Sequence, residues 1–468
     1  MHVRISTVGL ALLICFPLTN SSHAGEARAE RNWPSFRGPA HTGVAPGANP
    51  PHEWSEAKNV RWKVELEGSG HASPVIWGDR IYVMSAVKTE GQVQPQTTGE
   101  SDVEILPASQ QSPEAQQQPP QHQRRGGHPP SEKPTHVHQF VVGAYDLKTG
   151  KRAWKTVVRE EVPHESLHST ASQVSASPVT DGKHIWAFFG SRGLYCLNMD
   201  GRLVWDVDLG TQNTRNEFGE GASPVVQGDL IVINWDHEGD SFIVAFDKKT
   251  GKESWRKPRD ERTSWSTPLV VRDGDRDVLV VAAAARVRGY DLKSGDEVWS
   301  VSGLGANVVP TPVADEEVVW VMSGYRDSYG MAIRYPGARG DLTGSDRVRW
   351  GTDRGLSYVP SAVLVDGRIF FFQRFAGILS CYELRSGKAC YDQQRIDGHE
   401  NIYSSPVSAD GKIYSVSRDG SAVVFRASGD FEILARNELD DVFNATPAIV
   451  GNTMVLRGDR YLYNLGVD

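Results

Sequence analysis

The sequence predicts an all-β fold, an eight-bladed β-propeller of four-stranded antiparallel blades, and three observations lead to this prediction. A short motif, ASPV or a close variant, recurs eight times at intervals of about 44 residues. Most copies are followed by a polar turn such as DKKTGK and then a tryptophan. No long segment has the 3.6-residue apolar period of a helix. A repeat of this length is typical of propellers, in which each copy forms one blade.

The first residues are typical of an export signal. Arg4 precedes an apolar run from Val8 to Pro17, and Ser22 and Ala24 are small residues placed as at a cleavage site. We expect residues 1–24 to be a signal peptide and the mature protein to be periplasmic or extracellular. The run is shorter than the roughly 20 residues of a membrane-spanning helix, so no transmembrane segment is expected in the mature chain, although an uncleaved N-terminal anchor is the alternative.

Residues 25–58 form an N-terminal extension, and residues 59–468 form the propeller. Each first-strand motif marks the innermost strand of a blade, and the copies lie at 72–75, 176–179, 222–225, 266–269, 310–313, 360–363, 404–407 and 445–448. The eighth unit ends at YLYNLGVD, without an outer strand. The segment NVRWKVEL, residues 59–66, supplies the missing strand. A blade shared between the two ends of the chain closes the ring and leaves no free sheet edge.

The recurring turn before the tryptophan has a structural explanation. In DKKTGKESW, Asp247 can accept hydrogen bonds from backbone N–H groups of the turn, and Gly251 can adopt the positive φ that such turns often need. Trp255 then lets a short outer strand bury a large aromatic surface. The same position is expected to provide a packing contact in six blades, through Trp62, Trp154, Trp205, Trp255, Trp299 and Trp350.

One insertion interrupts the first blade between its second and third strands. Residues 88–138 are rich in Gln, Pro and Gly and cannot bury a core, so they are expected to be disordered. The segment leaves the blade on the same side as the loops that join neighbouring blades. The segment is interpreted as a flexible spacer. Alternatively, its histidines, His122, His128, His136 and His138, chelate a metal.

Charge and cysteine content restrict the partners. The 468 residues carry a formal net charge of -8, and nucleic-acid binding needs a basic face, so no such partner is expected. Removing residues 1–24 leaves Cys196, Cys381 and Cys390, an odd number for an oxidising compartment. Cys381 and Cys390 flank one hairpin turn and could pair, or all three thiols could be small apolar core residues. The oligomeric state cannot be inferred.

A functional site is expected on the top face, formed by the loops that enter each first strand and the loops between second and third strands. These loops are individual, whereas the turns at the opposite end are repetitive. Several polar and aromatic residues fall in them and are candidates for binding: Arg215, Glu217, Glu220, Trp265, Arg326, Arg374 and Asn401. The alternative for Glu220 is a carboxylate that ties neighbouring blades together, and for the arginines it is local pairing with aspartates.

Two stretches of these loops have residue types that bind metals. Asp236, Glu238 and Asp240 provide oxygen ligands suited to Ca²⁺, or form a solvated polar turn. His164 to His168 read HESLH, which matches a two-histidine zinc motif whose Glu activates water. That chemistry needs a sustained helix, and this stretch follows Pro163 in a loop rich in Ser and Thr. A hydrolytic metal site is therefore the weaker interpretation.

The pattern A-x-D-x-x-T-G-x-x-x-W, at 144–154 and 245–255, resembles the tryptophan-docking motif of the quinoprotein (PQQ-like) propeller family. The opening NWPSFRG, residues 32–38, is also similar to that of secreted bacterial members. The family includes alcohol dehydrogenases, which use PQQ as cofactor together with a bound Ca²⁺, and it also includes non-enzymatic scaffolds of the BamB type. The dehydrogenases have a vicinal disulfide, whereas this sequence has no Cys-Cys pair. No catalytic residue is assigned. The resemblance implies an exported scaffold that binds an envelope protein, peptide or glycan, or alternatively an oxidoreductase acting on alcohols or sugars.

Overall fold

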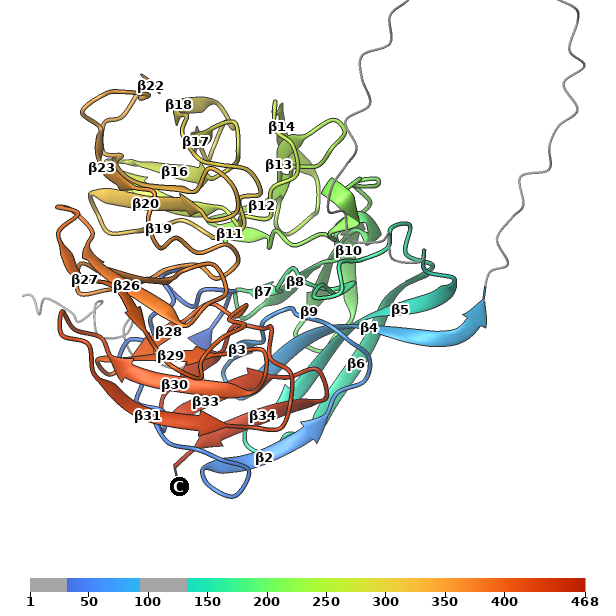
Figure 1. Ribbon diagram of the computed structural model, residues 1–468. Helices are drawn as coiled ribbons and strands as arrows, with labels where there is room; N and C mark the ends of the chain where they lie inside the picture. Colours follow the sequence, from blue (N-terminus) through green and yellow to red (C-terminus); the bar gives the residue numbers. More distant parts are fainter. Residues whose placement is uncertain (1–31, 93–132, 468) are drawn as a thin grey trace, which may run out of the picture.

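The computed structural model describes residues 32–92 and 133–467, and these residues form eight sheets, each built on four antiparallel strands and arranged as the blades of a propeller (Figure 1). The all-β, eight-bladed fold that the repeat predicts is confirmed. Within the described ranges the helical segments are two single turns of 3-10 helix, η1 (Gly190–Arg192) and η2 (Arg215–Glu217). The predicted signal peptide, residues 1–24, lies outside the described residues. No helix in the described residues is long and apolar enough to cross a membrane.

The blades follow one another along the chain, each from its innermost to its outermost strand. Blade 1 consists of β3 (Val75–Trp77), β4 (Arg80–Gln92), β5 (His136–Asp146) and β6 (Arg152–Glu161), and blade 2 consists of β7 (Val179–Thr180), β8 (His184–Phe188), β9 (Leu194–Asn198) and β10 (Leu203–Val207). Blade 3 consists of β11 (Val225–Gln227), β12 (Leu230–Trp235), β13 (Phe242–Asp247) and β14 (Glu253–Pro258), and blade 4 consists of β15 (Leu269–Asp273), β16 (Arg276–Val281), β17 (Val287–Asp291) and β18 (Glu297–Val301). Blade 5 consists of β19 (Val313–Ala314), β20 (Val318–Ser323), β21 (Tyr329–Arg334) and β23 (Val348–Thr352), and blade 6 consists of β24 (Val363–Val365), β25 (Arg368–Phe372), β26 (Ile378–Glu383) and β27 (Ala389–Arg395). Blade 7 consists of β28 (Val407–Ala409), β29 (Lys412–Val416), β30 (Ser421–Arg426) and β31 (Ile433–Glu438), and blade 8 consists of β32 (Ala448–Val450), β33 (Thr453–Arg457), β34 (Tyr461–Gly466) and β2 (Val60–Glu65).

The ring is closed by a strand from the N-terminal part of the chain. β2 pairs antiparallel with β34, and Trp62 lies opposite Asn464 in this ladder. Figure 1 shows the blue β2 beside the red β34. Blade 8 is therefore shared between the two ends of the propeller, as the position of NVRWKVEL predicts. The closure pairs an outer edge that would otherwise be exposed.

The outer-strand tryptophans connect each blade to the next. The indole N–H of Trp255 donates to the carbonyl oxygen of Leu292, 3.0 Å away, and the ring lies against Gly295 in the turn of blade 4. A β-carbon at Gly295 would come within 2.5 Å of this ring, so the turn needs glycine for close approach as well as for its φ of 73°. The same arrangement joins Trp62 to Gly150, Trp154 to Gly201, Trp205 to Gly251 and Trp350 to Gly387.

Trp299 differs from the other five tryptophans. Its side chain is 1% exposed and packs on Gly289 of its own blade. Blade 5 has no short TGK turn for it to contact, because residues 335–347 form a longer connection. Part of this connection, β22 (Gly340–Asp341), pairs parallel with β18, and Gly340 lies opposite Trp299. Trp299 is therefore a buried packing residue, as expected, but it packs within its own blade and not against a glycine turn of the next blade.

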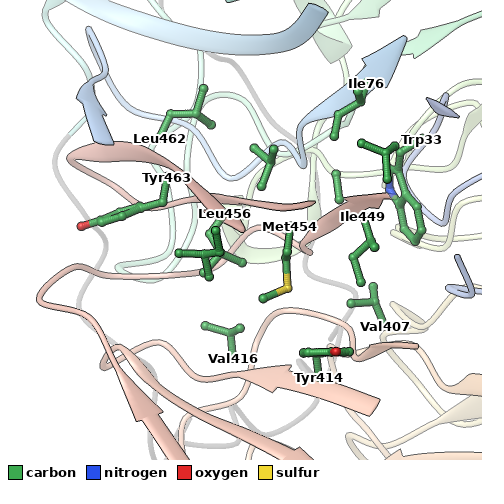
Figure 2. Packing of buried hydrophobic residues seen from close by; sticks show 14 of the residues in the cluster. Trp33, Ile76, Val407, Tyr414, Val416, Ile449, Met454, Leu456, Leu462 and Tyr463 are labelled. Carbon is green, nitrogen blue, oxygen red and sulfur yellow. The ribbon is translucent and has the colours of Figure 1, made fainter. Parts of the chain in front are cut away.

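The described part of the N-terminal extension, residues 32–58, passes beneath the propeller before it reaches β2. β1 (Asn32–Trp33) pairs with β3, and the carbonyl oxygen of Pro34 accepts the N–H of Thr180 in blade 2. Arg37 then donates to the carbonyl oxygen of Ala362, at the start of blade 6, over 2.7 Å. Blades 2 and 6 lie opposite each other in a ring of eight, so the segment crosses the central channel. Figure 2 shows Trp33 of this segment packed near Ile76 and Ile449, in the core between blades 8 and 1.

Two other expectations are modified. β4 and β5 continue into the predicted insertion, since Lys88 pairs with His138 and Gln92 lies opposite His136. The ends of residues 88–138 are thus strand, and residues 93–132, with His122 and His128, lie outside the described residues. Cys196, Cys381 and Cys390 are all free thiols, so the suggested pairing of the last two is not made.

Candidate functional site

A cavity of about 490 Å³ opens on the top face at the propeller axis. The cavity lies on the axis because every blade contributes the residue that stands directly before the proline, or Ala362, of its first-strand motif. These residues are Ser73, Ser177, Ser223, Thr267, Thr311, Ser361, Ser405 and Thr446. All eight carry hydroxyl groups, so the wall includes a hydroxyl ring, the name used below for these residues.

The hydroxyl ring also links the blades. The backbone N–H of Ser73 donates to Ser177 Oγ at 2.9 Å, that of Ser177 donates to Ser223 Oγ at 2.9 Å, and the pattern continues around the axis. Among the described residues, seven of the eight junctions have this bond; blades 4 and 5 are joined instead by Ser266 Oγ and the carbonyl oxygen of Pro310. At these seven junctions the hydroxyl oxygen satisfies a buried N–H group of the preceding blade.

The N-terminal segment forms the floor of the cavity. Phe36 lines it, and the neighbouring Arg37 is 1% exposed. The guanidinium of Arg37 donates to the carbonyl oxygens of Pro406, at 3.0 Å, and Ala362, at 2.7 Å, in two neighbouring blades. Burial lowers the pKa of Arg37 to about 9, so the group remains charged at neutral pH. The channel is therefore closed below by a segment anchored on both sides of the ring.

Aromatic side chains form two groups in the wall. On one side, Tyr325 stacks on Tyr358 with ring centroids 5.0 Å apart. Phe375 lies 5.4 Å from Tyr358 and stacks on Tyr403 at 4.7 Å, which extends the row. On the other side, Phe218 lies between His168, at 5.2 Å, and Trp265, at 6.5 Å. The cavity therefore presents ring faces and edges from several blades to whatever enters it.

Glu220 and Trp265, both predicted candidates, lie in the cavity wall. The Glu220 carboxylate accepts hydrogen bonds from the N–H of Ser191, at 2.8 Å, and from the Ser191 hydroxyl. It also lies 3.4 Å from the guanidinium of Arg192, so it ties blade 2 to the start of blade 3. The indole N–H of Trp265 donates to the carbonyl oxygen of Gly219 at 2.6 Å, which fixes the ring in the wall. The geometry supports a bracing role for Glu220 and a surface role for Trp265.

Two further polar groups reach the cavity from blades 8 and 1. Asn444 Nδ2 lies 3.1 Å from His71 Nε2. Burial, with the charges of Arg457 and Arg418, lowers the pKa of His71 to about 3, so this imidazole is neutral at physiological pH. Asn444 Oδ1 is buried without a hydrogen-bond partner among the described residues. It is thus a buried acceptor in the cavity wall.

The remaining top-face candidates lie around the mouth. Glu217 accepts from the N–H and hydroxyl of Ser166, and the N–H of Arg215 donates to Thr263 Oγ1 at 2.9 Å. Arg326 lies 5.3 Å from the ring centre of Tyr325, and Arg374 Nη2 lies 3.4 Å from the carbonyl oxygen of Tyr325. Asn401 is exposed and has a φ of 55°. It contributes its backbone, since its carbonyl oxygen accepts the N–H of Arg418 at 3.0 Å.

The proposed calcium ligands do not form a metal site. Asp236 accepts two hydrogen bonds from Arg259, at 2.7 and 3.0 Å, and both side chains are fully buried. Burial alone would lower the pKa of Arg259, but the attraction of the Asp236 carboxylate is stronger than this effect, so the pKa of Arg259 is raised. Glu238 accepts from the Thr263 hydroxyl at 2.9 Å instead of facing Asp236. No group of three or more His, Cys, Asp or Glu side chains in the described parts of the chain is placed to hold a metal ion.

The HESLH stretch is not a zinc motif either. Residues 164–168 form a loop and not a helix, so the two imidazoles do not share one helical face. His164 Nε2 lies 2.7 Å from the carbonyl oxygen of Gln212, and His168 packs edge-on against Phe218. Glu165 is buried, and its carboxylate accepts from the N–H and hydroxyl of Thr214. Burial raises the pKa of Glu165, and the stretch braces blade 2 against blade 3.

The residues of the cavity do not fit a calcium-bound PQQ. PQQ carries three carboxylates, yet the described residues that line the cavity include no lysine or arginine, and the nearby arginines lie outside the lining. Their single carboxylate, Glu220, is already bonded to Ser191 and Arg192. Ca²⁺ needs six to eight oxygen ligands, often with several carboxylates, and the wall provides no such set. No catalytic step through this cofactor can be derived.

Sequence reasoning missed most of the cavity. The repeat was identified by its Pro, but the hydroxyl residue before it, present in all eight copies, was the signal for the hydroxyl ring. The missed aromatic residues are Phe36, Phe218, Tyr325, Tyr358, Phe375 and Tyr403. Four of them fall in the top loops GYRDSYG, LSYVP, RFAG and NIYS, so an aromatic residue in successive loops was the available clue.

Comparisons with known proteins agree with this architecture. The family model described as outer membrane protein assembly factor BamB matches residues 138–393, more than half of the chain. BamB of Burkholderia pseudomallei (strain K96243) is 23% identical over 339 residues, which cover 68% of this chain and 78% of that protein. A quinohemoprotein alcohol dehydrogenase of Pseudomonas putida, ADH-IIG, is 29% identical over 128 residues, only 25% of this chain and 16% of that enzyme. A europium-containing methanol dehydrogenase superposes with a TM-score of 0.59 at 10% identity, covering 96% of this chain and 100% of that one, and shows the shared fold.

Proposed function

Because this chain belongs to the family described as outer membrane protein assembly factor BamB, we propose that it is a non-enzymatic binding protein of the cell envelope. Its top-face cavity binds a segment of a partner protein. Export follows from the signal sequence expected at residues 1–24, and the BamB relative, an assembly factor by name, supports a protein as the partner.

The observation that carries this proposal is the aromatic lining of a cavity closed at its lower end. Seven aromatic residues line it, from Phe36 at the floor to Tyr403 at the mouth. Its volume of about 490 Å³ falls in the range of binding sites, which are mostly apolar with a few polar groups. The carboxylates and imidazoles around it are engaged in bracing contacts or kept neutral, so the site offers contact area and not acid–base chemistry.

A peptide selection tests the proposal. Peptides from a random displayed library are selected on the purified mature protein and then measured by calorimetry against two variants. Ala171→Trp fills the cavity from its wall, whereas Leu203→Trp adds the same side chain to an outer strand, where Leu203 is 51% exposed. We expect binding to be lost in Ala171→Trp and kept in Leu203→Trp. If no peptide is selected, or if both variants bind equally well, the cavity is not the binding site.

An oxidoreductase is the second candidate, favoured by Trp265 in the cavity wall and by the match to an alcohol dehydrogenase. It is separated from the first by titrating the protein with PQQ, with and without Ca²⁺, and by following dye reduction with alcohols and sugars. Calcium-dependent binding with dye reduction, abolished by Trp265→Ala, would replace the binding-protein proposal. From the residues of the cavity we expect no heat of PQQ binding in the titration and no dye reduction.

A further inference from the structure

Four arginines surround the mouth of the cavity. Each lies beside an aromatic residue of the cavity wall or is close enough for its charge to influence one. Arg326 and Arg374 directly adjoin Tyr325 and Phe375 in the chain. Arg418 lies 5.6 Å from the ring centre of Tyr403. Arg215 is close enough to Tyr358 for its charge to affect that phenol across the mouth. These four side chains are called the mouth arginines below.

The mouth arginines have no carboxylate partner. In the described ranges, none of the four has an acidic oxygen within 4.0 Å, whereas Arg192, Arg259 and Arg288 nearby are all paired. The guanidinium groups of Arg326 and Arg418 lie over tyrosine rings, and Arg374 donates to one backbone carbonyl at 3.4 Å. Local ion pairing with aspartates, the alternative for the top-face arginines, is therefore not made within 4.0 Å by these four side chains, although Arg418 is close enough to Asp459 to act on its charge. Guanidinium groups without a direct carboxylate partner are available to an incoming anion.

Neighbouring acidic groups are mostly engaged elsewhere. Glu217 is bonded to Ser166, Glu220 to Ser191 and Arg192, and Asp419 to Ser417 and Ser421. Asp459 lies 3.7 Å from His71; burial raises the pKa of Asp459, and the charges of Arg457 and Arg418 partly oppose this rise. Asp327 and Glu400 are exposed on the same loops and offset part of the positive charge. The mouth therefore combines four arginines that form no ion pair with carboxylates that offset much of their charge, on a chain of net charge -8. An acidic group that reaches the arginines can form the charge-assisted hydrogen bonds that these carboxylates do not form.

We propose that the ligand is an acidic peptide segment, in which a large apolar side chain enters the aromatic cavity and flanking Asp or Glu carboxylates contact the mouth arginines. This inference rests on the proposed function and specifies its ligand. Arginine binds carboxylates through charge-assisted, often bidentate, hydrogen bonds. The apolar part of the segment contacts Phe218, Trp265 and Phe375 in the wall.

An acidic glycan fits the cavity less well. A sugar is polar around its whole circumference and needs many side-chain hydrogen bonds. The hydroxyl oxygens of the ring already accept N–H groups of the blades at seven junctions among the described residues. Apart from Asn444, His71, His168 and Glu220, the described lining is aromatic, aliphatic, hydroxyl-bearing or glycine. These residues suit an apolar group in the cavity and place the charge recognition at its mouth.

The test uses three synthetic peptides on the full mature chain, measured by calorimetry: acetyl-GDEFEDG-amide, its uncharged analogue acetyl-GNQFQNG-amide, and acetyl-GDEAEDG-amide, which lacks the phenylalanine. We expect the first to bind at least about tenfold more tightly than either of the others, since several exposed ion pairs act together. This advantage is expected to fall sharply at about 1 M salt, where the Debye length is about 3 Å.

Variants locate the effect. Arg326→Ala and Arg418→Ala are each expected to weaken the acidic peptide about two- to fivefold and to leave the uncharged analogue unchanged. Arg349→Ala is the matched control, because Arg349 is exposed on β23, an outer strand, and its loss changes the net charge equally. Melting curves for all variants verify folding.

Two outcomes overturn the inference in distinguishable ways. If the uncharged peptide binds as tightly as the acidic one and Ala171→Trp abolishes both, the cavity binds peptides without selecting acidic ones, and the proposed function survives alone. If neither peptide binds, and the library also yields none, the proposed function fails together with the inference. Acidic binding that is insensitive to Arg326→Ala and Arg418→Ala also contradicts the role of the mouth arginines.

Discussion

Removing one docking tryptophan is expected to destabilise the whole ring. Trp255 joins blade 3 to blade 4, and the change Trp255→Ala removes both its hydrogen bond to the carbonyl oxygen of Leu292 and its contact with Gly295. The glycine cannot compensate, because it has no side chain to fill the space. The perturbation therefore leaves a gap at the junction and a carbonyl group without its partner.

The magnitude follows from these two contacts. A buried aromatic side chain removes about 150–250 Å² from water, worth about 25 cal/mol per Å². Trp255 is only partly buried, so we take about 100 Å², or about 2.5 kcal/mol. The lost hydrogen bond adds about 1 kcal/mol. We expect Trp255→Ala to lower the free energy of unfolding by about 3 to 4 kcal/mol, and Trp255→Phe by about 1 to 2 kcal/mol, since the ring contact is largely kept.

Urea unfolding followed by circular dichroism measures both values, provided that the transition is reversible. Leu203→Ala is the control, because Leu203 is 51% exposed on an outer strand and should change the stability by less than about 0.5 kcal/mol. A cost below about 1 kcal/mol for Trp255→Ala, or an equal cost for Trp255→Ala and Leu203→Ala, would refute the view that this tryptophan holds neighbouring blades together.

Three other predictions follow from the fold. Deleting residues 59–66 removes β2 and should lower the melting temperature strongly; an unchanged melting curve would contradict the shared blade. Thr446→Val leaves the N–H of Ser405 without its acceptor and should cost about 1 to 3 kcal/mol in urea unfolding, whereas Thr446→Ser should cost much less. Burial lowers the pKa of His399 to about 4 from the usual value of 6.5, so the unfolded chain takes up a proton at higher pH than the folded protein does. The free energy of unfolding is therefore unaffected by His399 above pH 6.5 and falls by about 3 kcal/mol as the pH is lowered from 6.5 to about 4. The His399→Asn variant should lose correspondingly less stability over that range, and equal pH profiles would exclude this contribution.

The fold could be predicted because its signals are local and repeated. The turn Asp247 to Gly251 and the tryptophan that follows lie within nine residues, and the Asp247 carboxylate does bond the N–H and hydroxyl of Thr250. Repetition then gave the number of blades, and the unpaired eighth unit gave the closing strand. The repeat did not show that Trp299 packs differently from the other tryptophans, because its environment depends on residues 335–347, a connection in the next blade that departs from the repeat.

The site was harder to predict because its parts are distant in the chain. Tyr325, Tyr358, Phe375 and Tyr403 meet only once blades 5 to 7 are in place. Asp236 shows the opposite error. Its acidic neighbours within five residues suggested a cation site, whereas its true partner is Arg259, 23 residues away. Proximity in the sequence is therefore a good guide to turns in this fold and a poor guide to ligand sites.

Site-specific photo-crosslinking tests the central claim, that the top-face cavity binds a segment of a partner protein, most directly. Tyr403, in the cavity wall, is replaced by benzoylphenylalanine in a cell that exports the protein, and the same group is placed at Leu203 as a control. The account predicts a polypeptide adduct at position 403, whose linked segment mass spectrometry identifies as apolar and acidic, and which Ala171→Trp abolishes. No adduct at position 403, or the same adduct at both positions, would contradict it.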